Sequence, residues 1–68
     1  MEQIGQQEKQ LSIIRMPELV RITGLSKVGI YRLMKEDSTF PRQVDLGKRA
    51  VGWFQHEVNE WLLSRKRV

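Results

Sequence analysis

The sequence predicts a mainly α-helical fold that carries one small β-hairpin. Apolar residues recur at helical spacing in two separate segments, and a stretch after Pro41 alternates apolar and polar residues with period two. The chain has 68 residues, which allows one compact core at most. We therefore expect a single domain over residues 12–68. Residues 1–11 are rich in glutamine and too polar to pack, so we expect them to form a flexible N-terminal tail.

The first predicted helix covers about residues 17–23. Pro17 suits the first helical position, where the N–H that it lacks would have no partner. Gly24 suits the left-handed residue that ends a helix. A short strand is expected over Ile13 and Ile14, just before this helix.

A second helix is predicted to begin at once, with Ser26 as its N-cap. Ile30, Leu33 and Met34 follow at i, i+3 and i+4 and form one apolar stripe. The four residues 23–26 between the helices include a glycine, which is typical of a helix-turn-helix. The same pattern also occurs in helical hairpins that bind no DNA.

The second half of the chain predicts the hairpin and a third helix. Residues 42–46 and 50–53 are expected to be two strands, joined by a tight turn at Gly47-Lys48-Arg49. A helix over about 55–65 follows. The order is helix, turn, helix, basic hairpin, helix, which is a winged helix-turn-helix.

Composition limits the classes of function. Lysine and arginine number 12 against 8 acidic residues, a formal charge of +4, and such a balance favours nucleic acid as a partner. The chain has no cysteine and one histidine, which excludes a disulfide framework and a Cys/His zinc site, and we expect no cofactor. No segment reads as a signal peptide or membrane span, so we expect no membrane partner and, in a bacterium, a cytoplasmic protein.

The outward face of the second helix and the tip of the hairpin are the predicted DNA-binding site, because a major groove admits an α-helix and a wing reaches the flanking backbone. Arg32 could bond a guanine edge or clamp a phosphate. The alternative is that these are simply solvent-exposed faces. The candidate residues are Ser26, Lys27, Val28, Gly29, Tyr31, Arg32, Lys35, Lys48 and Arg49.

Other residues are better explained by structure than by chemistry. Gly29 either lets the helix approach the DNA backbone or is simply tolerated in a first turn, and the sequence leaves both explanations open. Trp53 and Trp61 are expected in the core, because a small domain needs large side chains to bury. His56 has no second ligand or base beside it, and no nucleophile is paired with a base, so we do not expect an enzyme.

Several spaced motifs follow one another between about residues 13 and 64. They are Met16-Pro17-Glu18-Leu19, Thr23-Gly24-Leu25-Ser26, Ile30-Tyr31-Arg32-Leu33, Phe40-Pro41, Leu46-Gly47-Lys48-Arg49-Ala50-Val51-Gly52-Trp53 and Glu57-Val58-Asn59-Glu60-Trp61-Leu62. Together they resemble the AlpA-type phage and prophage regulators. The resemblance implies a MerR-like or excisionase-like winged helix in which the candidate residues above correspond to the recognition helix and the wing.

The sequence departs from the family pattern in three places. Gly29 stands where a serine or threonine is usual, which puts the groove contacts of that position in doubt. Phe54 and Gln55 replace more polar residues and weaken the predicted N-cap of the last helix. The segment 36–39 is acidic and slightly long, which bears on how the wing is presented.

The resemblance implies a sequence-specific binder of double-stranded DNA that regulates a prophage or genomic island. It would activate transcription of an integrase or excision gene, or act as an excisionase-type directionality factor. The alternative is a protein-interaction adaptor, similar to an anti-repressor, with Phe54 and the last helix as its contact surface. Charge alone does not separate DNA from RNA. The operator and any homo-oligomerisation or cooperative binding on DNA stay open.

Overall fold

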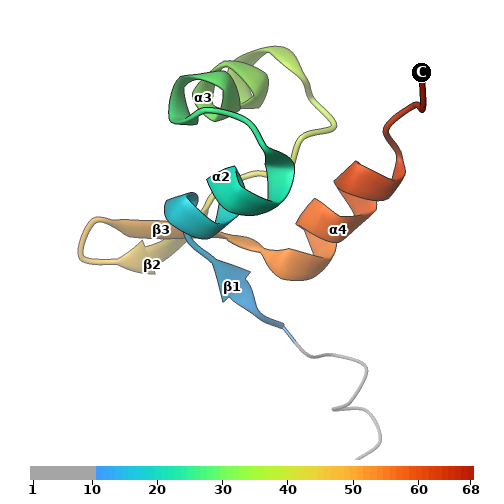
Figure 1. Ribbon diagram of the computed structural model, residues 1–68. Coiled ribbons are helices and arrows are strands. Elements are labelled where there is room, and N and C mark those ends of the chain that lie inside the picture. Colours follow the sequence, from blue (N-terminus) through green and yellow to red (C-terminus); the bar gives the residue numbers. More distant parts are fainter. Residues whose placement is uncertain (1–10) are drawn as a thin grey trace, which may run out of the picture.

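The computed structural model describes residues 11–68, and there it shows three helices and a three-stranded antiparallel sheet (Figure 1). Every element expected from the sequence is present in the expected order. The tail predicted for residues 1–11 lies outside the described residues, apart from Leu11, whose side chain is exposed. The elements are β1 (Ile13–Ile14), α2 (Met16–Thr23), α3 (Lys27–Glu36), β2 (Val44–Gly47), β3 (Ala50–Phe54) and α4 (Gln55–Leu63).

The helix boundaries differ slightly from the prediction. Helix α2 starts at Met16, one residue early, and α4 ends at Leu63 instead of residue 65. Ser64 is the C-cap of α4, and its hydroxyl donates to the Trp61 carbonyl at 2.7 Å, which satisfies a carbonyl of the last turn. No helix within residues 11–68 combines the length and the apolar character that crossing a membrane requires.

The core draws one or two side chains from almost every element. The two tryptophans predicted to be structural are both buried, Trp53 completely and Trp61 to 8% exposure. Phe40, in the segment that joins α3 to β2, meets Trp61 edge to face with ring centroids 4.9 Å apart. The buried apolar residues are Ile14, Leu19, Ile30, Phe40, Trp53, Val58 and Trp61. This cluster fixes α2 and α3 against the sheet and α4.

Strand β3 is the centre of the sheet, with the order β1-β3-β2. Ile13 pairs with Phe54 and Ile14 with Trp53, while β2 pairs along the other edge of β3. Gly52 allows this close approach, because a Cβ at that position would lie 2.5 Å from Ile13 Cγ2 and 2.9 Å from the Ile14 carbonyl oxygen. A glycine at the centre of the sheet is therefore a packing requirement.

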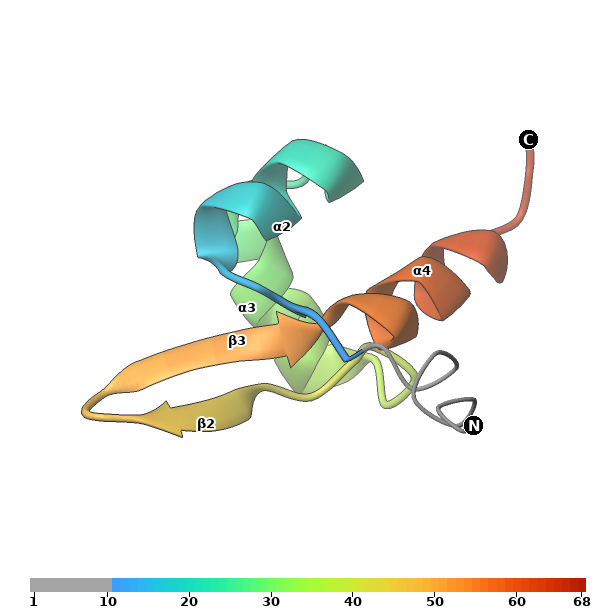
Figure 2. The same ribbon diagram turned by 90° about the horizontal axis from the view of Figure 1, so that it is seen from below.

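The hairpin of β2 and β3 extends away from the rest of the molecule (Figures 1 and 2). Strand β3 runs from the hairpin turn directly into α4, so the turn and the C-terminal end of α4 lie at opposite ends. In both views α3 and the hairpin turn lie away from that end of α4. Neither of the two predicted binding elements is therefore next to the C-terminal end of α4.

Candidate nucleic-acid interface

The turn between α2 and α3 is held by backbone geometry and one hydroxyl. Gly24 adopts φ +75 and its amide donates to the Val20 carbonyl at 2.9 Å, as predicted for the residue that ends the helix. The Thr23 hydroxyl donates to the Leu19 carbonyl at 2.7 Å and accepts from the Leu25 amide at 3.2 Å. These bonds fix the direction in which α3 leaves the turn.

Ser26 caps α3 as the sequence predicts. Its hydroxyl accepts from the Gly29 amide at 3.0 Å, which satisfies one of the amides that have no partner in a first turn. Gly29 is half-buried beside this cap, and a Cβ there would lie 3.2 Å from the Ser26 hydroxyl oxygen. Among the candidate residues of α3, Gly29 is therefore the one that faces its own N-cap.

The other candidate side chains of α3 share one exposed face. Ile30 is completely buried, and Leu33 and Met34 pack against the core, so the opposite side of the helix is free. On that side Val28 is 66% exposed and Tyr31 45%. We call this surface the outer face of α3. It consists of Lys27, Val28, Tyr31, Arg32 and Lys35, all exposed.

The hairpin turn holds two basic residues in an uncommon backbone conformation. Gly47 pairs with Ala50, so the connection is a two-residue loop made of Lys48 and Arg49. Their φ angles are +48 and +66, both in the left-handed region that a type I′ turn requires and that asparagine and glycine usually occupy. The sequence predicted the turn but not this conformation. We refer to Lys48 and Arg49 as the hairpin tip.

A bulge on β2 leads into the tip. The register shifts between Asp45 and Gly47, which leaves Leu46 as the extra residue. The Asp45 carboxylate accepts from the Gly47 amide at 2.8 Å, and Gly47 itself has φ +90. The Asp45 side chain therefore stabilises the turn through this hydrogen bond, while the side chains of Lys48 and Arg49 are exposed.

The outer face of α3 and the hairpin tip together present five exposed cations. Within residues 11–68 none of the five forms a salt bridge; the ion pair found there joins Arg21 to Glu18 on α2. Exposed cations without an acidic partner on a helix and on a loop are suited to a polyanion. The predicted surface of α3 is therefore not buried against the rest of the molecule, and its role in binding DNA stays a prediction.

Arg15 is a basic residue that the sequence reasoning did not single out. It follows β1 directly, and its Nε donates to the Val51 carbonyl on β3 at 2.8 Å. The guanidinium is therefore held at the base of the hairpin, on an exposed part of the surface. The contact depends on the register between segments far apart in the chain, so no local pattern could have revealed it.

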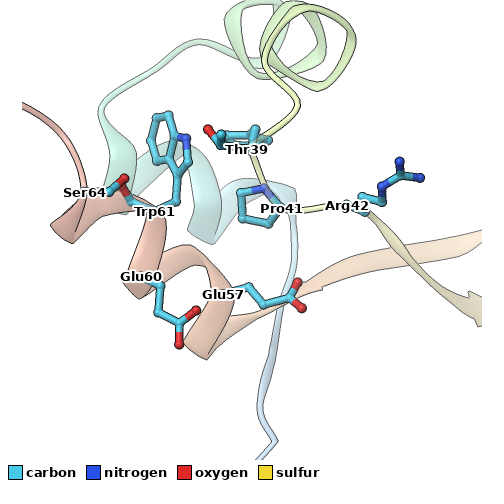
Figure 3. Close-up of a pocket in the computed structure, with 8 residues that line it drawn as sticks. Thr39, Pro41, Arg42, Glu57, Glu60, Trp61 and Ser64 are labelled. Atoms are coloured by element: carbon cyan, nitrogen blue, oxygen red, sulfur yellow. The ribbon is translucent and has the colours of Figure 1, made fainter.

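A groove lies beside α4, and none of the five cations lines it (Figure 3). It has a volume of about 400 Å³, and Figure 3 shows Pro41 and Trp61 within it and the Glu60 carboxylate pointing away from the indole. Its lining comes from the 39–42 segment and from α4: Thr39, Phe40, Pro41, Arg42, Glu57, Glu60, Trp61 and Ser64.

Phe54, His56 and Glu57 lie at the start of α4. Phe54 occupies the N-cap without a side-chain hydrogen bond, as predicted from its apolar character. His56 is exposed, and its ring lies 5.7 Å from that of Phe54. Glu57 lies in the first turn of α4, where a negative charge is favoured.

The acidic segment after α3 is an ordered turn. The Asp37 carboxylate accepts from the Thr39 hydroxyl and from the Thr39 amide, at 2.5 and 2.9 Å. These hydrogen bonds hold the pKa of Asp37 below its ordinary value, and the charge of Arg65 acts in the same direction. The segment that departs from the family pattern is thus structured through its acidic residue.

Comparison with known proteins places the chain in a family. The family model described as "Prophage CP4-57 regulatory protein (AlpA)" matches residues 12–66, which include every described helix and strand. The chain belongs to the AlpA family. The resemblance inferred from the spaced motifs is thereby confirmed.

Two relatives of this AlpA-family chain share more than a third of their aligned residues with it. It is 36% identical over 61 residues to "DNA-binding transcriptional activator AlpA" of Escherichia coli (strain K12), covering 82% of this chain and 87% of the relative. It is 39% identical over 56 residues to "Uncharacterized protein ORF88" of Enterobacteria phage P4, covering 82% of this chain and 62% of the relative. No solved structure matches the chain at a comparable level of significance.

Proposed function

We propose that this AlpA-family protein is a transcription regulator that binds double-stranded DNA with sequence specificity. The observation that carries the proposal is the outer face of α3, which is exposed, cationic and free of ion pairs within residues 11–68. The printed name of the Escherichia coli relative, a DNA-binding transcriptional activator, supports the same class of function.

In this proposal α3 enters the major groove and the hairpin acts as a wing. Tyr31 and Arg32 reach base edges or the adjacent phosphates, and Val28 offers an apolar contact to a thymine methyl group. Lys27 and Lys35 bind phosphates near the two ends of the helix, because an ammonium is a point charge without base-reading geometry. Lys48 and Arg49 hold the backbone or minor groove beside the major-groove site.

In more detail, the proposed role is to regulate genes of a prophage or genomic island. The proposed location of the protein is the cytoplasm. The chain would activate transcription of an integrase or excision gene, or direct excision itself. The family description, which names a prophage regulatory protein, supports this setting. The domain responsible is residues 12–68, because the elements that build both binding surfaces lie there.

Selection from a pool of random-sequence duplexes, followed by footprinting on neighbouring genomic DNA, tests the proposal. We expect a short enriched sequence, a protected site near an integrase gene or attachment site, and binding that weakens steeply with salt. Recovery of no enriched sequence, with equal and salt-insensitive binding to any polymer, would contradict it.

The groove beside α4 favours one alternative, a protein-interaction adaptor. Apolar side chains of Phe40, Pro41 and Trp61 line the groove together with Glu57 and Glu60, and none of the five cations belongs to its lining. Cross-linking in nuclease-treated extract separates the two functions. A stoichiometric protein partner that persists without DNA, and is lost in a Glu57→Gln/Glu60→Gln variant, would favour the adaptor.

A further inference from the structure

Arg15 occupies the point at which β1 leaves the sheet. The pairing of β1 with β3 ends with Ile14 opposite Trp53, so the next pair in this register would be Arg15 and Gly52. The chain turns into α2 at this point, and β1 offers no further backbone donor to β3. The Arg15 side chain replaces it, because its Nε donates to the Val51 carbonyl at 2.8 Å.

The Arg15 stem lies close to Gly52 on β3. A Cβ on residue 52 would stand 3.4 Å from Arg15 Cδ, an ordinary van der Waals distance, so the aliphatic part of the side chain runs beside the strand. The stem is therefore held at two points, by packing near Gly52 and by the bond from Nε. An exposed arginine normally samples many rotamers, and this one has lost part of that freedom before any ligand arrives.

The guanidinium keeps most of its hydrogen-bonding capacity. Arginine carries five N–H donors, and the bond to Val51 uses the one on Nε. Within residues 11–68 the two terminal amino groups have no hydrogen-bond or ion-pair partner. Two free amino groups on a fixed plane are the geometry that binds phosphate oxygens in pairs.

This guanidinium is bonded to the strand that leaves the hairpin tip. Val51 follows Arg49 by two residues, a span of about 7 Å along a strand. Along one DNA strand the charges are spaced about 3.4 Å apart in projection on the helix axis, so a cation at each place can meet nearby phosphates. The edge of β3 thus carries a cation at its base as well as at its tip.

We infer that Arg15 binds a DNA phosphate beside those contacted by the hairpin tip, as a third contact region next to the outer face of α3 and the hairpin tip. This inference rests on the proposed function and extends it to a residue outside α3 and the hairpin. A purely structural role of Arg15 requires the hydrogen bond to Val51 and does not require the positive charge. The two roles therefore differ in what the loss of that charge does to the salt dependence of binding.

The test uses the full chain and a duplex selected with the wild-type protein. Arg15→Gln and Arg15→Met remove the charge, and Arg15→Met keeps much of the stem that packs near Gly52. We expect either variant to bind the duplex about tenfold more weakly. We also expect the slope of log K against log salt to fall by about 0.9. Thermal unfolding of each variant confirms that binding is measured on folded protein.

Arg67→Gln is the matched control, since it removes the same charge from an exposed position at the C-terminal end. We expect its slope and affinity to stay at the wild-type values. If the folded Arg15 variants keep the wild-type slope and lose only thermal stability, the inference is wrong and the proposed function stands. If the wild-type protein itself selects no duplex, the proposed function fails first.

Discussion

Lys48 and Arg49 are consecutive residues that both adopt a left-handed backbone conformation, at φ +48 and +66, where the hairpin reverses direction. For residues other than glycine and asparagine, that conformation costs about 1–2 kcal/mol per residue. Lysine and arginine at two such positions suggest a role for their charge that is separate from folding. The proposed contact with DNA supplies that role.

Replacing the tip by the residues that its turn prefers separates stability from binding. We expect Lys48→Asn/Arg49→Gly to raise the free energy of unfolding by about 1 kcal/mol, because asparagine and glycine adopt a type I′ turn with less strain. The same variant should bind duplex DNA more weakly. The slope of log K against log salt should become shallower by the amount expected for the loss of nearly two phosphate contacts. Urea unfolding and a salt titration measure the two effects. Equal DNA binding would mean that the tip does not touch the duplex.

Arg32 is the side chain of α3 with the geometry to read a base. We expect Arg32→Ala to weaken binding of the selected duplex by about 1–3 kcal/mol and to relax specificity at one base pair if Arg32 contacts a guanine. Lys27→Ala should weaken all sequences alike. Arg21→Ala is the control, because Arg21 pairs with Glu18 on α2 and is outside the proposed surface. A loss as large for Arg21→Ala as for Arg32→Ala would argue against the assigned face.

The packing requirement at Gly52 can be tested with alanine, which adds only a methyl group. We expect Gly52→Ala to lower the free energy of unfolding by about 1–3 kcal/mol, because the added methyl overlaps Ile13 and the Ile14 carbonyl. Gly24→Ala is a useful comparison, since a Cβ at Gly24 meets nothing within 4 Å and only the left-handed backbone opposes it. Its cost should be about 1 kcal/mol. An unchanged midpoint of urea unfolding for Gly52→Ala would show that β1 can move away from β3 without loss.

Asp37 should make the stability of the fold depend on acid pH. Its pKa is lowered in the folded chain by the Thr39 hydrogen bonds, so the unfolded chain takes up the proton first as pH falls. The stabilisation is complete above about pH 4 and is lost as pH falls through the folded pKa. Urea unfolding of wild type and Asp37→Asn between pH 6 and pH 2.5 measures it. We expect the difference between them to shrink toward low pH, and a constant difference would rule out this linkage.

The elements and the outer face of α3 could be predicted because they follow from local rules. The stripe of Ile30, Leu33 and Met34 determines which side of α3 is buried, and the opposite side is therefore exposed. Ser26 and Gly24 mark a helix start and a helix end through their own chemistry. The positions that these residues were expected to occupy agree with the structure.

The contacts that could not be predicted depend on register and on packing between distant segments. The bond from Arg15 to Val51 exists because β1 ends opposite Trp53, which no pattern near Arg15 encodes. The tip conformation follows from the pairing of Gly47 with Ala50, which selects a two-residue loop without regard to its side chains. The groove beside α4 likewise arises only when Phe40 meets Trp61.

Hydroxyl-radical footprinting of a selected duplex tests most directly whether α3 and the hairpin tip grip one DNA molecule together. The wild-type protein should protect a central segment and one flank, and Lys48→Gln/Arg49→Gln should lose the flank while keeping the centre. Arg32→Ala should weaken protection at the centre. Identical footprints for the wild type and the tip variant, or no protection by the wild type at any concentration, would contradict the account.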